Sequence, residues 1–190
     1  KNIDATIRGS LAASNVLKQL KESYPKISRA TYIHGKGHEF IISSVGIDEG
    51  NTLKEKLNIA VHCIDFMKKL KKTPKIATLS YARPGDYGRS EEINQSLDDA
   101  KKLTQLIEKH TNQKIENSCV LIDQAIKNKC NILIAPNGIV GNTIFRTLVL
   151  LNSWPSFGAI TFGIDDIYID TSRDPVSYTH LRAHETPEHL

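Results

Sequence analysis

Residues Asn131–Arg173 read NILIAPNGIVGNTIFRTLVLLNSWPSFGAITFGIDDIYIDTSR, and this stretch decides the fold. The apolar run Ile132–Ala135 has the length of a buried strand and leads into a loop with glycines at positions 138 and 141. A helix is predicted from about Asn142 to Leu151, and two short apolar strands follow it. A strand, a glycine loop, a helix and further strands in this order are typical of a layered α/β domain.

The rest of the chain repeats this alternation. The predicted elements, by residue number, are a strand at 3–7, a helix at 10–23 with Ser10 as its N-cap, a hairpin of strands 30–34 and 39–44, a helix from 52 to 70, a strand at 75–80, a helix at 91–110, a polar connector at 112–118, a brief strand at 119–120 and a helix at 121–127. The pattern predicts an α/β fold with a mainly parallel sheet and an antiparallel portion.

Composition places the chain among ordinary globular proteins, with 39% hydrophobic and 24% charged residues. No run approaches the roughly 20 apolar residues that a membrane helix needs. The net charge of +4 is modest. Lysines gather at positions 68, 69, 71, 72 and 75 around one helix end. A solvated helix end accounts for them better than a nucleic-acid site, because no aromatic residues are interleaved. We therefore expect a cytoplasmic protein without a membrane or nucleic-acid partner.

Cysteine and histidine positions give no clear metal site. Cys63, Cys119 and Cys130 are too widely spaced for a disulfide framework or a CxxC site, which favours buried thiols in a reducing cytosol over a catalytic thiol. His34 and His38 flank a predicted turn and are interpreted as exposed turn residues.

Both native ends of the protein are predicted to be missing from this chain. The chain begins at Lys1 and its only methionine is Met67, so we expect a fragment. Val176–Leu190 reads VSYTHLRAHETPEHL and looks like a translated sequencing adapter, so it is left out of functional reasoning despite the spacing of His180 and His184. The predicted organisation is one α/β region at 1–175 and a non-native tail at 176–190.

Three junctions between a strand and a helix share a design suited to an anionic ligand. They combine glycines, which let backbone approach a ligand, with helix N-termini and arginines, which favour phosphate or carboxylate. In open parallel sheets such loops gather at the carboxyl edge, where ligands bind. The candidate ligand-binding residues are Arg8, Ser10, Ser80, Arg83, Arg89, Asn137, Gly138, Gly141, Asn142, Ser172 and Arg173.

Structural roles remain open for several of these residues. The glycines could serve only to form turns, and Arg89 could pair with Asp86 on the surface. The carboxylates Asp48, Glu49 and Asp170 are interpreted as solvated or capping groups. GxSxG, Walker, HExxH and GxGxxG motifs are all absent from the sequence.

Three segments resemble the phosphate acetyl/butyryltransferase superfamily in order and spacing: IDATIRGSLAASNVLKQLKE, LSYARPGDYGRSEEINQSLDDAKKL and the stretch from ILIAPNG to DTSR. The loops VGIDEG and PGDYGRSEEI resemble those of a methanogen family within it, the methanogenesis marker protein 4 or MtxX family. The resemblance covers residues 3–173. It implies an isocitrate/isopropylmalate dehydrogenase-like architecture with two domains, a homodimer, and an active site in the interdomain cleft.

The resemblance also implies roles for particular residues. In the acyltransferases a serine-arginine pair helps to bind phosphate and thioester, and it matches Ser172 and Arg173 here. The asparagine-glycine loop matches Asn137–Asn142. In these enzymes an aspartate just beyond the pair acts as base toward the thiol of coenzyme A. No residue is assigned to that role here, because the suspected tail replaces the region and Asp174 lies too close to Arg173. The loop Tyr81–Gly85 departs from the lysine loop usual in acetyltransferases, which argues against acetyl phosphate as the substrate.

Three hypotheses about function follow. The first is a transferase of methanogen metabolism, linked to acyl, phosphate or methyl transfer, that binds a phosphate-type or coenzyme-A-type ligand in an arginine-lined cleft. The second is a non-catalytic accessory subunit with a corrinoid or pterin methyltransferase as its partner. The third is a metal-dependent dehydrogenase of the same fold, which lacks the expected carboxylate cluster.

Overall fold

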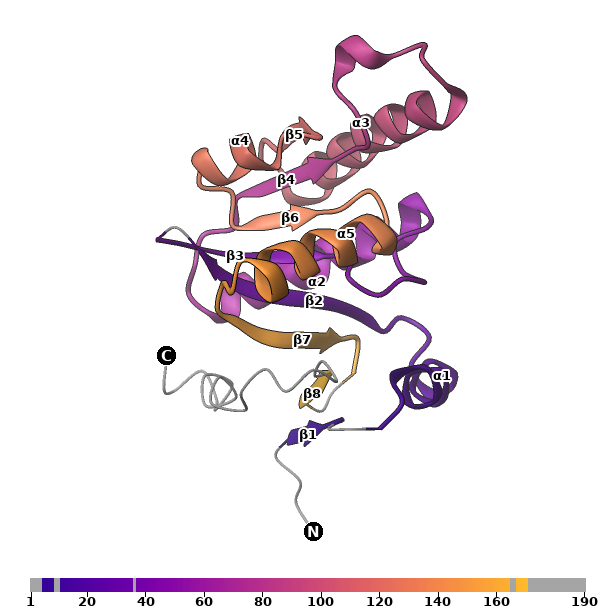
Figure 1. Ribbon diagram of the computed structural model, residues 1–190, viewed down its shortest axis with the longest axis vertical. Coiled ribbons are helices and arrows are strands. Elements are labelled where there is room, and N and C mark those ends of the chain that lie inside the picture. Colours follow the sequence, from indigo (N-terminus) through magenta and orange to yellow (C-terminus); the bar gives the residue numbers. More distant parts are fainter. Residues whose placement is uncertain (1–4, 9–10, 36, 165–166, 171–190) are drawn as a thin grey trace.

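The computed structural model describes residues 5–8, 11–35, 37–164 and 167–170 of the chain. They form one eight-stranded sheet with helices on both faces (Figure 1). The strands are β1 (Ala5–Ile7), β2 (Ser28–Gly35), β3 (His38–Ser43), β4 (Ile76–Leu79), β5 (Glu116–Cys119), β6 (Ile132–Ile134), β7 (Ser156–Phe162) and β8 (Ile167–Asp170). The helices are α1 (Ala13–Ser23), α2 (Leu53–Lys69), α3 (Glu91–Thr111), α4 (Ile122–Lys127) and α5 (Gly138–Phe145), with a 3-10 turn η1 (Pro84–Asp86) and a π-helical segment η2 (Arg146–Leu151).

The strand order is β1-β8-β7-β2-β3-β6-β4-β5. Parallel pairs join β3, β6, β4 and β5 on one side of the sheet and β1 with β8 on the other. Antiparallel pairs join β2 to β3 and to β7, and β7 to β8. The prediction of a mainly parallel sheet with an antiparallel portion is therefore confirmed. Between β1 and β3 the sheet contains three antiparallel pairs, β8 with β7, β7 with β2 and β2 with β3. Strand β1 therefore runs in the direction opposite to β4 and β6.

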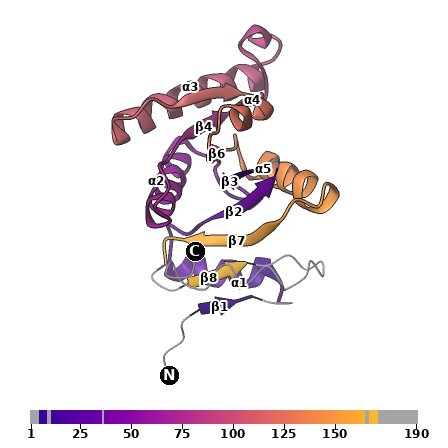
Figure 2. The same cartoon turned by 90° about the vertical axis from the view of Figure 1, so that its left-hand side faces the viewer.

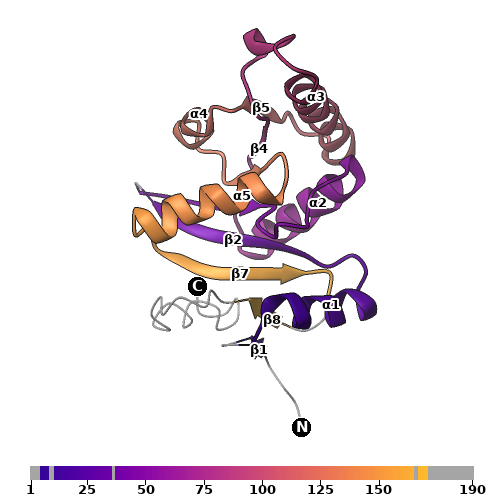
Figure 3. The same ribbon diagram turned by 45° about the vertical axis from the view of Figure 1, so that its right-hand side comes forward.

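Alternating strand residues supply the two cores. In β6, Ile132 and Ile134 join the core under α2 and α3, whereas Leu133 joins the core under α4, α5 and η2. Figure 2 shows α2 and α3 on one face of the sheet and α5 on the other, and Figure 3 shows α1 beside β8 and β1. Because all three β6 residues are fully buried, each isoleucine or leucine contributes roughly 1.5–3 kcal/mol of transfer free energy.

Two helix starts differ from the prediction. Helix α5 begins at Gly138 rather than Asn142, because Asn137 is its N-cap and accepts a hydrogen bond from the Val140 N–H. Glycine has a low helix propensity, so the sequence pattern favoured a loop there, and tertiary packing overrides that preference. The N-cap of α1 is Ala12, so the prediction of Ser10 as the N-cap was wrong; Ser10 itself lies outside the described residues.

The predicted polar connector at 112–118 is partly wrong as well. Residues 116–118 belong to β5, where Glu116 pairs with Ala77 and Asn117 with Thr78. Strand β5 is the last in the sheet order, and an edge strand tolerates polar side chains that a central strand does not. The helices predicted at 52–70 and 91–110 begin close to their predicted starts, and Thr52 and Ser90 are their N-caps.

The three cysteines are free and buried, as expected for structural thiols. Burial raises the pKa of Cys63, and burial together with Glu116 raises the pKa of Cys130 to about 12. Both groups are therefore thiols rather than nucleophilic thiolates at neutral pH. Within the described ranges there is no group of three or more His, Cys, Asp or Glu residues placed to hold a metal ion.

No helix in the described part of the chain is both long enough and apolar enough to cross a bilayer. The suspected tail at 176–190 lies outside the described residues, so the division of the chain near residue 175 stays a prediction.

Candidate functional site

Asn137 links two of the three predicted junctions. Its side-chain oxygen caps α5 at 3.0 Å from the Val140 nitrogen, and its amide nitrogen donates to the Tyr81 hydroxyl at 2.6 Å. Tyr81 follows β4 and Asn137 follows β6, and these neighbouring parallel strands end at the same edge of the sheet. The expectation that these two loops meet at the carboxyl edge is therefore confirmed.

The two glycines of α5 pack against the loop that follows β3. A Cβ atom on Gly138 would lie 1.5 Å from the Gly46 carbonyl oxygen, and one on Gly141 would lie 1.7 Å from that of Ser44. Side chains at either position are excluded by backbone atoms, which cannot move as a flexible side chain can. Gly138 and Gly141 therefore allow the start of α5 to pack against residues 44–46, at the beginning of the VGIDEG loop (45–50). This packing requires glycine more strictly than a turn alone would.

The first turn of α5 uses most of its own amide groups. The Gly138 N–H donates to the Glu49 carbonyl oxygen at 2.9 Å, and the Val140 N–H donates to Asn137. Asn142 donates its side-chain amide to the Val45 carbonyl oxygen at 3.1 Å, so it fixes the loop rather than facing the edge. An anion at this helix would therefore meet the Ile139 N–H and the helix dipole, not three free amides.

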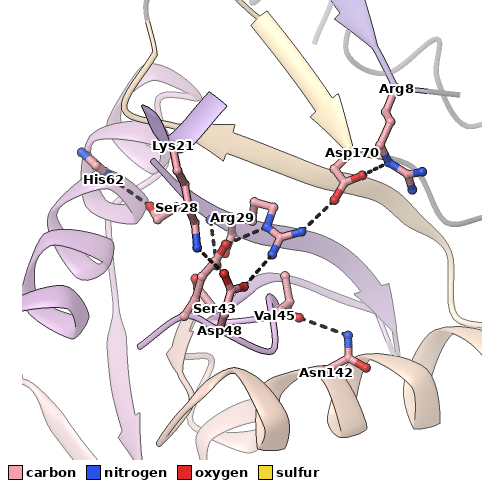
Figure 4. Close-up of polar contacts among 11 residues, drawn as sticks. Arg8, Lys21, Ser28, Arg29, Ser43, Val45, Asp48, His62, Asn142 and Asp170 are labelled. Carbon is pink, nitrogen blue, oxygen red and sulfur yellow. Dashed lines mark hydrogen bonds and ion pairs between the residues drawn. The ribbon is translucent and has the colours of Figure 1, made fainter. Parts of the chain in front are cut away.

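A chain of buried opposite charges crosses the sheet from β1 to the VGIDEG loop (Figure 4). Arg8 pairs with Asp170 and donates to the Leu11 carbonyl oxygen. Asp170 also accepts from Arg29 at 2.8 Å, and Arg29 pairs with Glu49 at 2.6 Å. The Glu49 and Asp170 side chains are only 6% and 9% exposed, so the expectation that they are solvated or capping groups was wrong.

The buried chain ends in a partly exposed pair. Asp48 forms an ion pair with Lys21 of α1 and lies 3.6 Å from Arg29. Burial alone would lower the pKa of Arg29, but the Glu49 and Asp170 carboxylates outweigh it and raise that pKa. Three cations, Arg8, Arg29 and Lys21, thus face three carboxylates. Among the described residues these charges balance, and both arginines are held in ion pairs within the fold.

Asp48 makes stability at this site depend on pH. Burial opposes ionisation of Asp48, but Lys21 and then Arg29 lower its pKa below the usual value, so its ion pair stabilises the fold above about pH 4. That contribution is lost as the pH falls through the lowered folded-state pKa. We expect Asp48→Asn to unfold at lower urea than the wild type at pH 7, with the difference shrinking toward pH 3.

The measurement is the urea midpoint at each pH by circular dichroism. Asp123→Asn, which removes an exposed pair with Lys127, is the matched control and should change the midpoint little at either pH. An Asp48→Asn deficit that stays constant from pH 7 to pH 3 would contradict the assignment.

The arginines of the loop after β4 lie at the surface. Arg89 pairs with Asp86 at 3.1 Å with its side chain 72% exposed, as one of the two readings of the sequence expected. Arg83 is exposed, and its backbone N–H donates to Asp86. Ser80 is buried and donates to the Ala82 carbonyl oxygen, which shapes the start of the loop.

Helix α3 does not offer an anion site at its start. Ser90 caps it, and Glu91 and Glu92 occupy its first turn, where they repel anions. Ser10, Ser172 and Arg173 lie outside the described residues.

Two residues of this region were missed by sequence reasoning. Arg29 stands in a β2 segment that is otherwise buried and mostly uncharged, and a charge in such a segment signals a buried ion pair. Tyr81 was noted only as part of a loop. Its partner Asn137 lies 56 residues away, and no local pattern indicates that contact.

Two relatives with similar sequences come from methanogens. A protein of Methanosarcina barkeri named "Putative methyltransferase mtx subunit X" is 37% identical over 177 residues, which cover 91% of this chain and 64% of that protein. A protein of Methanocaldococcus jannaschii named an uncharacterized methyltransferase is 33% identical over 180 residues, covering 90% of this chain and 73% of that protein. No protein-family model matches the chain. The chain spans less than two thirds of the Methanosarcina relative.

Solved structures of similar fold are acyl transferases and a dehydrogenase. A branched-chain phosphotransacylase from Enterococcus faecalis superposes with a TM-score of 0.68 and 19% identity over 90% of this chain and 67% of that one. A phosphotransacetylase from Streptococcus pyogenes superposes with the same TM-score and sequence identity, and the match covers 90% of this chain and 57% of that one. A 4-hydroxythreonine-4-phosphate dehydrogenase from Klebsiella pneumoniae superposes with a TM-score of 0.54 and 13% sequence identity. The match covers 90% of this chain and 53% of that one. The fold is therefore that of the phosphotransacetylases and their dehydrogenase-like relatives.

Proposed function

Because this chain belongs to the mtx subunit X family of methanogenic archaea, we propose that it is a transferase-like protein that binds a phosphate-type or coenzyme-A-type anion. The ligand lies at the sheet edge where the loops after β3, β4 and β6 meet. The observation that carries the proposal is the hydrogen bond between Asn137 and Tyr81, which joins two of these loops at the start of α5. The phosphotransacylase-type fold supports the same placement.

The charges around this edge limit what the described residues contribute. Arg8 and Arg29 each form ion pairs with buried carboxylates. In the arginine-lined cleft expected from the sequence, other residues must therefore supply the positive charge that meets the ligand. The resemblance to acyltransferases assigns that role to Ser172 and Arg173, which follow Asp170 in the sequence. Asp170 pairs with Arg29, whose other partner Glu49 lies in the loop after β3. In this proposal Arg173 neutralises charge that develops on the ligand during transfer, and the protein acts as a homodimer.

Replacing Arg173 with alanine tests this assignment. Since a charged hydrogen bond to an anion contributes about 1.5–3 kcal/mol, we expect Arg173→Ala to weaken binding of coenzyme A or inorganic phosphate by at least about tenfold in calorimetry. Arg146→Ala on η2, an exposed arginine outside the three junctions, is the control and should bind as the wild type does. Equal binding by wild type and Arg173→Ala would rule against the role of Arg173.

Two observations favour a second function. The Methanosarcina relatives are named as subunits, and Arg8 and Arg29 form ion pairs with carboxylates of the same chain. In this alternative the chain is a non-catalytic subunit that binds a corrinoid or pterin methyltransferase. It predicts no turnover by the chain alone and co-elution with that methyltransferase in size-exclusion chromatography. Acyl or methyl transfer by the isolated chain would exclude it.

A further inference from the structure

The orientation of the Asn137 amide is fixed by its two contacts. The Val140 N–H can only donate, so the atom that it meets at 3.0 Å must be the Asn137 oxygen. The Asn137 amide nitrogen therefore faces the Tyr81 hydroxyl at 2.6 Å. An amide nitrogen only donates, so the Tyr81 oxygen accepts this hydrogen bond and its own proton is directed elsewhere.

No described residue accepts the Tyr81 proton. The backbone of Tyr81 is held in place, because its N–H donates to the Ser96 hydroxyl at 3.0 Å. The side chain is partly exposed at the sheet edge. Burial raises the pKa of Tyr81, and the negative charges of Glu92 and Asp99 raise it further, so the hydroxyl stays protonated at physiological pH. A fixed and protonated donor with no acceptor among the described residues thus lies beside the N-terminus of α5.

We infer that the Tyr81 hydroxyl donates a hydrogen bond to an oxygen of the bound anion, and that Asn137 orients it for this role. The inference rests on the proposed function, since it names a residue that contacts the same ligand. Arg8 and Arg29 already form ion pairs with Asp170. The neutral Tyr81 hydroxyl can contact the anion without adding a positive charge to this region. An anionic oxygen of phosphate or of a phosphoester accepts such a bond more strongly than water does.

Tyr81→Phe tests the inference, because it removes the hydroxyl and keeps the ring. Tyr87→Phe is the matched control: Tyr87 belongs to the same loop, but its hydroxyl donates to Asp98 of α3 at 3.4 Å. Binding of coenzyme A and of inorganic phosphate is measured by calorimetry for wild type and both variants. We expect Tyr81→Phe to bind about tenfold more weakly and Tyr87→Phe to bind like the wild type.

A second variant tests the orienting role of Asn137. Asn137→Ser keeps an oxygen that can cap α5 but removes the amide that fixes the Tyr81 hydroxyl. We expect it to weaken binding by less than Tyr81→Phe, and the double variant to bind no more weakly than Tyr81→Phe alone, because both changes affect the same bond.

The outcomes separate the two claims. Equal binding by wild type and Tyr81→Phe overturns the role of Tyr81 and leaves the proposed function standing. A folded wild type that binds neither coenzyme A nor phosphate overturns both. Equal weakening by Tyr81→Phe and Tyr87→Phe shows a general effect on the loop and also overturns the inference.

Discussion

Replacing Arg29 with methionine is expected to destabilise the fold by about 3–5 kcal/mol, because it leaves the buried Glu49 carboxylate without its ion-pair partner and Asp170 with Arg8 alone. Arg29 bonds to Glu49 at 2.6 Å and to Asp170 at 2.8 Å, and both acids are almost fully buried. Because these side chains are only 6% and 9% exposed, solvent compensates little for the lost positive charge. The measurement is the free energy of unfolding from urea titration at pH 7.

A control variant at an exposed ion pair separates the effect of burial from the effect of losing a positive charge. Lys127→Met removes an exposed ion pair with Asp123, whose partners are 74% and 63% exposed, and should cost at most about 0.5 kcal/mol. The double variant Arg29→Met with Glu49→Gln should recover part of the loss, because it neutralises one stranded carboxylate. A loss below about 1 kcal/mol for Arg29→Met would show that the charge chain does not stabilise the fold.

Gly141→Ala is the second change with a large expected effect. Its Cβ would lie 1.7 Å from the Ser44 carbonyl oxygen and 3.2 Å from the Ala135 Cβ, so α5 must move away from the sheet. Overpacking of this kind costs about 1–3 kcal/mol, and we expect the upper end because backbone blocks the new atom. The same displacement should weaken ligand binding, since it moves Asn137.

Gly85→Ala is the control for that experiment. A Cβ at Gly85 meets no atom within 4 Å, so the same substitution should leave stability unchanged or raise it slightly. Both variants are compared by urea titration. Gly141→Ala with wild-type stability would mean that α5 does not pack against the 44–46 backbone as described.

Much of the fold could be predicted from local patterns. Local residues alone indicate the apolar run Ile132–Ala135, the helices that begin after Thr52 and Ser90, and the hairpin predicted at residues 30–44. The alternation of strands and helices then determines a layered α/β sheet. The start of α5 was predicted four residues late, because glycine has a low helix propensity and the close packing of Gly138 against the distant Gly46 carbonyl leaves no local signal in the sequence.

The candidate site depended more on distant contacts. The glycines and Asn137 were found because a glycine loop between a strand and a helix lets the backbone approach an anionic ligand at the helix N-terminus. The pairing of Arg29 with Asp170 joins residues 141 apart, and the pairing of Arg8 with Asp170 joins residues 162 apart. No sequence spacing reveals which arginine meets which carboxylate, so the sequence predicted an arginine-lined cleft where the structure shows a balanced set of charges.

The most direct test of the proposed function is a calorimetric titration of the folded chain with coenzyme A at low ionic strength, repeated with inorganic phosphate. A site at the junction of β4, β6 and α5 predicts saturable binding that weakens as salt is added, because the ligand is an anion. Saturable binding of either compound that is reduced in Arg173→Ala would support this account. A folded chain that shows no saturable heat with coenzyme A or with phosphate would contradict it.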